Sequence, residues 1–321
     1  MSQSLTDARP VHSGQDGQDG QDGQGRIAAL GPRRKLQLAL ATFWLFDAIL
    51  QFQPSMFGTA FPRMLAGGAQ GNPGLVAGPI IWSAGFIDHH LAGLNAVFAT
   101  MQLALGLGIA WRPTVRLALA ASVAWALAVW WLGEGLGGIL AGTASPVSGA
   151  PGAVILYAVL AVLLWPADRD ASAPFVAGRA VGRGPARLVW LAVWGSLAAF
   201  ALPPASRAIG GTISGMAPGE PAWLAWLDAR LGGWLGHHGL AASLVLAAVL
   251  AAVAVGVFLP APARRPVLVL AVAVAAAVWL AEGMGGILTG SGTDPNSGPL
   301  LALLALSFWP AAATGPAARG G

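Results

Sequence analysis

The sequence contains no cysteine and very few charged residues. Asp, Glu, Lys and Arg together make up 9% of the 321 residues, whereas a soluble domain is about 25% charged. The absence of cysteine excludes disulfides, thiolate metal sites and cysteine nucleophiles. A chain with so little charge lacks the polar surface that a water-soluble globule needs. Together with the 56% hydrophobic content and a mean hydropathy of +0.67, this predicts a polytopic integral membrane protein in contact with the lipid bilayer.

The apolar residues fall into long runs separated by short polar stretches. Residues 1–35 are polar and contain the sequence QDGQDGQDGQG, which cannot bury enough apolar surface to fold, so they are predicted to be a disordered cytoplasmic tail. A membrane-spanning helix needs about 20 residues, and only helices satisfy their own backbone in lipid. The fold class is therefore predicted as all-α. The eight predicted membrane helices are 36–53, 91–111, 115–133, 152–166, 188–204, 239–260, 266–282 and 298–313.

The basic residues predict the orientation of these helices. With the N-terminus inside the cell, the connections on the outer side carry only Arg63, Arg207 and Arg230. The other fourteen of the 17 basic residues then lie inside, which obeys the positive-inside rule. The same rule explains the net charge of +4 without a nucleic-acid partner. We therefore predict a multi-pass protein of the cell membrane with both termini in the cytoplasm.

One stretch of sequence occurs twice. Residues 131–142 read WLGEGLGGILAG and residues 279–290 read WLAEGMGGILTG, identical at nine of twelve positions and offset by 148. A repeat at a fixed period indicates duplicated structural units. Because each unit would contain four helices, an even number, the two must have the same orientation in the membrane and form parallel repeats. The predicted domains are a first module (36–166), a cytoplasmic linker (167–187), a second module (188–313) and a short cytoplasmic tail (314–321).

Histidines and glutamates of the repeat are predicted to meet at the outer face. The offset of 148 also carries His89-His90 onto His237-His238, at the start of the second helix of each module. Glu134 and Glu282 end the third helix of each module, so each Glu is expected beside a His pair. Imidazole commonly ligates metals and haem, and carboxylates also relay protons. Three interpretations stay open: a metal or haem site, a proton or solute site, and turns in which Glu134 accepts backbone hydrogen bonds and the glycines adopt φ > 0 or close backbone approach.

The first module alone carries further polar residues inside its apolar helices. Asp47 and Gln51 share a helix face with Trp44, and Asn95 and Gln102 share a face of the next helix. At the offset of 148 the positions of Asp47, Asn95 and Gln102 hold Gly195, Ser243 and Leu250; Gln51 becomes Ala199. An acid in an apolar helix should face the bundle rather than lipid. Asp47 would then either belong to a functional site or form a hydrogen bond that joins two helices.

Two stretches of the first module resemble the DoxX-like membrane proteins. Residues 91–122 (LAGLNAVFATMQLALGLGIAWRPTVRLALAAS) are similar to the family's central hairpin, and residues 45–65 to its first helix and the segment after it. The resemblance implies a four-helix module, here duplicated, and an association with membrane redox or quinone chemistry. The repeated Glu-Gly-x-Gly-Gly sequence and the His pairs depart from the family's pattern. The chain also looks like duplicated membrane proteins of high-GC bacteria, a resemblance that implies no function.

These observations leave three functional hypotheses. The first is a redox-associated membrane protein with an outer-face His/Glu site for a metal, haem, proton or quinone, acting with a membrane redox partner or as a homo-oligomer. The second is a transporter or channel for a small solute, and the third a non-catalytic membrane scaffold. The sequence contains no phosphate loop, G-x-S-x-G, HExxH or dinucleotide fingerprint, and whether the protein is an enzyme stays open.

Overall fold

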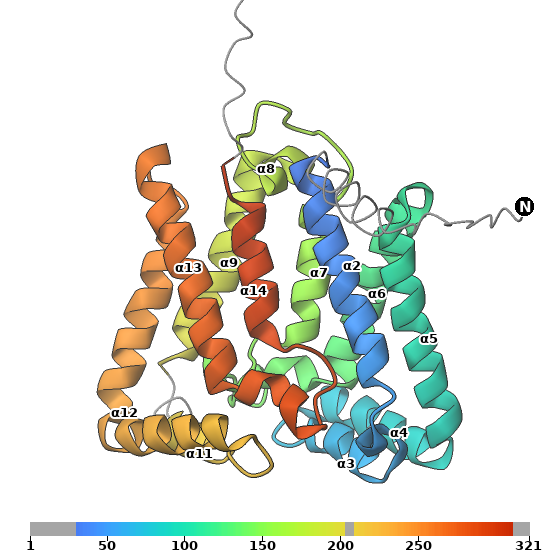
Figure 1. Ribbon diagram of the computed structural model, residues 1–321. Helices are drawn as coiled ribbons and strands as arrows, with labels where there is room; N and C mark the ends of the chain where they lie inside the picture. The colour runs from blue at the N-terminus through green and yellow to red at the C-terminus, as the bar shows by residue number, and fades with distance from the viewer. Residues whose placement is uncertain (1–29, 203–208, 311–321) are drawn as a thin grey trace, which may run out of the picture.

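The computed structural model describes residues 30–202 and 209–310, and all regular structure in these residues is helical, as predicted. Figure 1 shows the arrangement of the helices. The longer helices are α2 (Pro32–Leu50), α4 (Gly74–His89), α5 (Leu91–Ala110), α6 (Val115–Leu132), α7 (Ala153–Leu163), α9 (Arg183–Phe200), α12 (Ala222–Gly256), α13 (Ala261–Ala281) and α14 (Ser297–Ser307). The short elements are η1 (Pro54–Phe57), α3 (Ala60–Gly67), η2 (Arg112–Thr114), η3 (Gly135–Gly138), η4 (Pro146–Ser148), α8 (Val176–Val181), α11 (Ile209–Ser214) and η5 (Gly283–Thr289).

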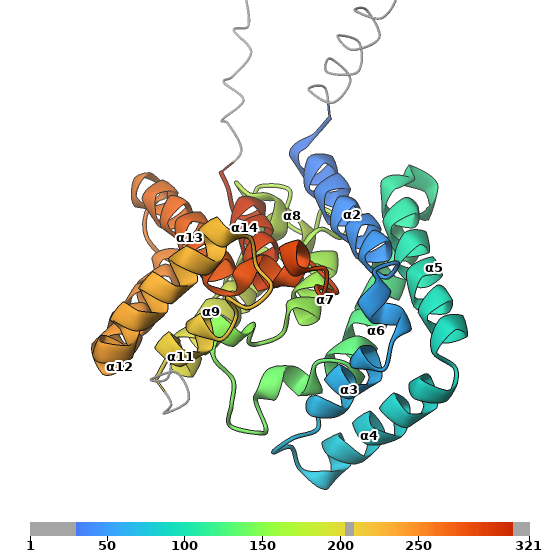
Figure 2. The ribbon, with the colours of Figure 1, turned by 60° about the horizontal axis from the view of Figure 1, so that its bottom comes forward.

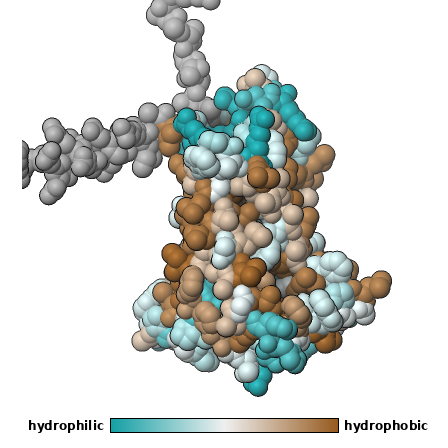
Figure 3. Space-filling model, turned by 90° about the vertical axis from the view of Figure 1, so that its right-hand side faces the viewer, coloured by the Kyte–Doolittle hydropathy of each residue, from teal (hydrophilic) through white to brown (hydrophobic). Residues whose placement is uncertain are grey.

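A helix covers each of the eight apolar runs, and four helices of the described part of the chain are long and apolar enough to cross a membrane. These four are Leu91–Ala110, Arg112–Leu132, Ala222–Gly256 and Pro262–Ala281. Their outer surfaces are strongly apolar, and Figure 3 shows a brown hydrophobic belt between two more hydrophilic ends. These features fit an α-helical membrane protein.

Several helix boundaries differ from the sequence prediction. Helix α2 begins at Pro32, inside the predicted tail, because proline fits the first turn of a helix. Residues 1–29 of that tail and residues 314–321 lie outside the described residues. Helix α9 begins at Arg183, inside the predicted linker. Helix α12 begins at Ala222, far ahead of the predicted 239, and bends at His238, where the backbone leaves helical geometry (φ −123°).

The long helices run between two ends of different character. At the upper end in Figure 1 lie α8, the start of α2 and the α5–α6 and α12–α13 turns. Arginines gather here: Arg33 pairs with Asp168 at 2.5 Å, and Arg34 donates to the carbonyl of Ile109 at 2.8 Å. The opposite end carries η3, η5, α3, α4, α11 and the first half of α12, which lie across the helix ends (Figure 2).

Helices α7 and α14 lie at the centre of a core that both halves of the chain share. They pack against each other and against α6 and α13, respectively, and most of their side chains are buried. The ring of Phe308 on α14 stacks on Phe175 and tilts against Trp190 on α9, with centroids 5.0 and 4.8 Å apart. Both central helices have 11 residues, about 16 Å of length, roughly half the thickness of the hydrocarbon layer.

Candidate functional site

The duplicated Glu-Gly-x-Gly-Gly sequence forms the same unusual turn in both halves. Residues 135–138 all have positive φ, between 55° and 71°, and residues 283–286 repeat this with φ between 53° and 69°. L-residues avoid this left-handed conformation at a cost of roughly 1–2 kcal/mol each. Glycine supplies three of the four positions, and only Leu136 and Met284 adopt it with a side chain. The prediction that the repeated glycines adopt φ > 0 is confirmed.

The turn places Glu134 beneath the N-terminus of α7. The Oε1 atom of Glu134 accepts a hydrogen bond from the backbone N–H of Val154 at 3.1 Å. A carboxylate at a helix N-terminus also interacts favourably with the helix dipole. The close approach depends on Gly152, because a Cβ at that position would lie 2.2 Å from the Oε2 atom of Glu134. This outcome fits the interpretation in which Glu134 organises the chain that follows it.

Glu282 occupies the corresponding place beneath α14, with different partners. Its Oε1 atom accepts a hydrogen bond from the Ser297 hydroxyl at 2.8 Å. The backbone N–H of Gly149, from the other half of the chain, also interacts with this carboxylate. The side chain of Glu282 is 3% exposed, and its Oε2 atom has no hydrogen-bond partner. The Oε2 atom of Glu134 is likewise buried and unpartnered.

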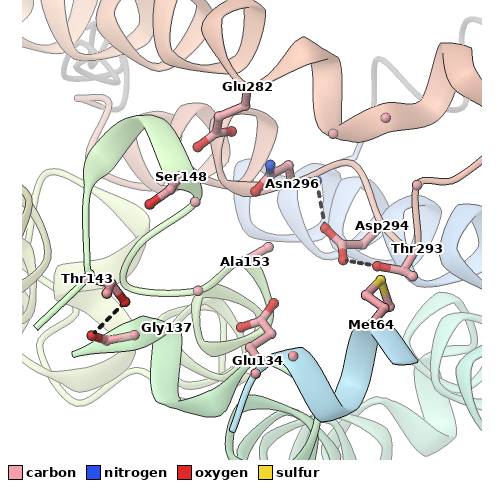
Figure 4. Close-up of a pocket in the computed structure, with 18 of the residues that line it drawn as sticks. Met64, Glu134, Gly137, Thr143, Ser148, Ala153, Glu282, Thr293, Asp294 and Asn296 are labelled. Carbon is pink, nitrogen blue, oxygen red and sulfur yellow. Dashed lines mark hydrogen bonds between the residues drawn. The ribbon is translucent and has the colours of Figure 1, made fainter. Parts of the chain in front are cut away.

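Both glutamates line one cavity between the two halves of the molecule. The cavity has a volume of about 650 Å³ and lies at the end of the bundle that carries η3 and η5. Figure 4 shows Glu282 and Glu134 on opposite sides of it, with Asp294 to one side of both. Exposed residues such as Thr143 and Ser291 also line it, so it opens to the surface. None of the lining residues among those described is Lys, Arg or His.

The third acid of the cavity, Asp294, is held by its own loop. Its Oδ1 atom accepts from the backbone N–H of Asn296 at 2.7 Å, and its Oδ2 atom accepts from the Thr293 hydroxyl at 2.9 Å. Asp294 could not be selected from the sequence, because it has no counterpart at the offset of 148. The only available signal was that it is an acid in the loop after the repeated turn.

The environment of these acids favours their protonated forms. Burial, together with the nearby charge of Asp294, raises the pKa of Glu134 and of Glu282 to about 8 in each case. Hydrogen bonds at the helix N-termini oppose the effect of burial without cancelling it. Burial also raises the pKa of Asp294. Near neutral pH the cavity therefore holds carboxyl groups that change charge when their surroundings change.

Hydrogen bonds join the two halves beside the cavity. The Gln53 side chain, just after α2, donates to the carbonyl of Gly292 at 2.9 Å. The Ser55 hydroxyl donates to the carbonyl of Gly290 at 3.1 Å. Both acceptors belong to the loop between η5 and α14. The cavity wall is thus fixed by contacts between segments more than 230 residues apart.

The predicted polar residues of the first module are buried in the helix bundle and do not line the cavity. Asp47 is 2% exposed and faces the Tyr157 side chain of α7. The Asn95 amide donates to the backbone carbonyl of Gln51 at 2.7 Å and joins α5 to the end of α2. Gln102 is also buried. These polar residues, here called the polar seam, therefore face the protein interior, as expected for polar groups in membrane helices.

The four histidines lie outside the cavity that Glu134, Glu282 and Asp294 line. His89 ends α4 and His90 caps α5, and both side chains are exposed. The Nδ1 atoms of His89, His90 and His238 lie 2.7, 3.0 and 2.9 Å from carbonyl oxygens four residues earlier. None of the four, His237 included, lines the cavity. Among the described residues, no three His, Asp or Glu side chains are grouped to hold a metal ion.

A further pair of acids, Glu220 and Asp228, lies near η5 in the second half. Glu220 is half-buried and Asp228 is 1% exposed. Burial, with the charge of Asp228, raises the pKa of Glu220 to about 7. Neither residue lines the cavity. Sequence reasoning missed the pair because both acids lie outside the duplicated stretch and outside the apolar segments.

Comparisons with protein-family models, with curated proteins and with solved structures found no match. The function proposed below therefore rests on the geometry and chemistry of the cavity.

Proposed function

We propose that this chain is an eight-helix protein of the cell membrane that binds a small polar solute in the acidic cavity at its outer face. In this proposal two parallel four-helix modules, related to the DoxX-like bundle, face the same way, with both termini in the cytoplasm. The arginine-rich end of the molecule is then the cytoplasmic end. The matching turns at Gly135–Gly138 and Gly283–Thr289 support the duplication.

The observation that carries the proposal is a cavity of about 650 Å³ lined by buried carboxylate oxygens without partners. Cavities that hold small molecules measure roughly 300–1,000 Å³ and carry a few convergent polar groups. A buried polar atom without a partner is unfavourable, so a bound molecule that pairs with the Oε2 atoms of Glu134 and Glu282 would be stabilised.

The short central helices support a transport-related function. Many secondary transporters bind their substrates at the ends of helices that stop within the membrane. Helices α7 and α14 are too short to cross the hydrocarbon layer, and both begin at the cavity. The solute would then bind at the outer ends of α7 and α14, at the interface between the two repeats.

A scaffold function is a second candidate, and the hydrogen bond from Val154 to Glu134 favours it. In that case the glutamates only cap α7 and α14, and the cavity holds water. The redox-associated function stays a separate proposal, since the histidines and the acids are not brought together. Haem absorbance, bound metal or bound quinone in the purified protein would support the redox function.

Thiol labelling tests the proposal directly, because the chain has no cysteine of its own. Thr143→Cys places a thiol in the cavity, and Ala171→Cys places one on the exposed linker. In intact cells a membrane-impermeant maleimide should label Thr143→Cys at once and Ala171→Cys only after permeabilisation. A panel of small polar solutes should include members that slow labelling of Thr143→Cys in purified protein. Labelling with the opposite sidedness, or no protection by any solute, would contradict the proposal.

A further inference from the structure

The walls of the cavity combine three carboxyl groups, two of which keep an unpartnered oxygen, with no basic side chain from the described residues. Glu134, Glu282 and Asp294 all line it, and the first two each keep one oxygen without a partner. A buried carboxylate is stable only when it is paired or protonated. A ligand with N–H donors and positive charge would form the strong, charge-assisted hydrogen bonds that these oxygens lack.

The spacing of the acids argues against a single metal ion. Coordination of a hard cation requires several oxygens at about 2.0–2.6 Å from one point. The described residues contain no group of three His, Asp or Glu side chains that meets this need. Each glutamate is instead anchored at a different helix N-terminus, Glu134 at α7 and Glu282 at α14. Acids held apart in this way suit a ligand that carries its charges at separate atoms.

Because the sequence is duplicated, each of two opposite sides of the cavity carries one equivalent glutamate. Figure 4 shows the glutamates of the two modules entering from opposite sides. We infer that the cavity takes a small organic dication of the diamine class, with one ammonium group bound near Glu134 and the other near Glu282 and Asp294. This inference rests on the proposed function, because it names the chemical class of solute for the same cavity.

Binding of such a ligand would release protons. Burial raises the pKa of both glutamates to about 8, so in the empty cavity at pH 7 they are mostly protonated. An ammonium group favours the ionised carboxylate and lowers this pKa. Diamine affinity is therefore expected to increase as pH rises from about 6 to about 8, with fewer protons released at the higher pH.

The test is calorimetric titration of the purified full-length protein with three matched molecules. These are 1,4-diaminobutane, n-butylamine and 1,4-butanediol, which share a four-carbon chain and differ in charge. The diamine should bind at least about tenfold more tightly than the monoamine or the diol, since each lost charged hydrogen bond weakens binding by about that factor. Titrations in two buffers of different ionisation enthalpy should show proton release at pH 7. Calcium chloride is titrated as the metal-ion comparison.

Single-residue variants test which acid binds each ammonium group of the diamine. Glu134→Gln and Glu282→Gln should each weaken diamine binding by about tenfold or more. Asp294→Asn tests the same end as Glu282 and serves if Glu282→Gln fails to fold. Asp88→Asn removes an exposed acid outside the cavity and should leave binding unchanged.

The outcomes separate this inference from the proposed function. If n-butylamine binds as tightly as the diamine, or if only one glutamate matters, a two-headed cation is wrong while solute binding stands. If the diol or calcium binds and the diamine does not, the cation class is also wrong. If none of these molecules binds and no solute slows labelling of Thr143→Cys, both the inference and the proposed function are overturned.

Discussion

The two copies of the duplicated turn share a backbone and differ in their surroundings. Both place four consecutive residues in the left-handed region, and both directly follow a glutamate that lies beneath a short helix. Glu134 is partly exposed and is held by a backbone N–H of its own half. Glu282 is 3% exposed and is held by Ser297 and by Gly149 of the opposite half. The duplicated sequence thus specifies the turn, whereas the neighbouring residues decide how far each acid depends on the other half.

The largest expected difference between the copies concerns the glycine at the third position of each turn, Gly137 or Gly285. A Cβ at Gly137 would lie 2.2 Å from the backbone oxygen of Pro151, whereas a Cβ at Gly285 would lie 2.9 Å from the Cβ of Asn296. Both positions have positive φ. Gly137→Ala should therefore lower the free energy of unfolding by on the order of 3–5 kcal/mol, and Gly285→Ala by about 2 kcal/mol.

Thermal or denaturant unfolding in detergent measures both effects. Gly78→Ala is the control, because a Cβ there meets nothing within 4 Å and should change stability by less than about 1 kcal/mol. Equal losses for Gly137→Ala and Gly285→Ala would show that the two turns are equivalent in their surroundings as well.

Removal of the glutamate side chain should also lower the free energy of unfolding by different amounts in the two copies. Glu282→Ala leaves the Ser297 hydroxyl and the Gly149 N–H without a buried acceptor, at a cost of about 1–3 kcal/mol. Glu134→Ala should cost less, because Glu134 is more exposed and water can replace it. Unfolding measurements on the two variants give the comparison. A larger loss for Glu134→Ala would contradict the idea that Glu282 joins the two halves.

The pH dependence of stability should reveal both acids. Their folded-state pKa of about 8 lies above the ordinary value of 4.5, so between these values the folded protein binds more protons than the unfolded chain. Stability is then greatest below about pH 4.5 for these groups and is lost as pH rises through 8. Unfolding temperatures measured from pH 5 to pH 9 should fall in the wild type and fall less in Glu134→Gln and in Glu282→Gln. Identical slopes in all three proteins would exclude a raised pKa at these positions.

The smallest effect concerns the polar seam, which only the first module has. Asn95→Leu removes the 2.7 Å hydrogen bond to the carbonyl of Gln51 and should cost about 1 kcal/mol, typical of such bonds between membrane helices. Thr100→Ala on the same helix removes only an exposed bond within α5 and should cost less. If both variants lose the same stability, the seam does not join α2 to α5.

The sequence predicted the helices better than the site. Long apolar runs and flanking arginines located a helix over each of the eight segments, because membrane helices depend mainly on local composition. The repeated glycines predicted left-handed turns, because few other residues adopt them. The composition of residues 221–230 allows an interfacial amphipathic helix, but it does not predict that this helix continues into the next apolar segment, as α12 does.

The assembly of the cavity lay beyond local patterns. Glu134, Glu282 and Asp294 meet only because α7 and α14 pack together at the centre, a contact between segments about 140 residues apart. The histidines occur at the same offset as the glutamates, yet each hydrogen-bonded imidazole pairs with a carbonyl one turn away. Sequence spacing shows which residues are repeated, whereas tertiary packing decides which of them meet.

The most direct test of the shared acidic cavity compares two thiol reagents on Thr143→Cys at about pH 9, where the acids are ionised. One is a cationic and the other an anionic methanethiosulfonate, both membrane-impermeant. An acidic cavity should favour the cationic reagent by about tenfold relative to an exposed control thiol at Ala171→Cys in detergent. Glu282→Gln, in the opposite half, should reduce this preference. No preference for the cation, or a preference that Glu282→Gln leaves unchanged, would contradict a cavity that the two halves share.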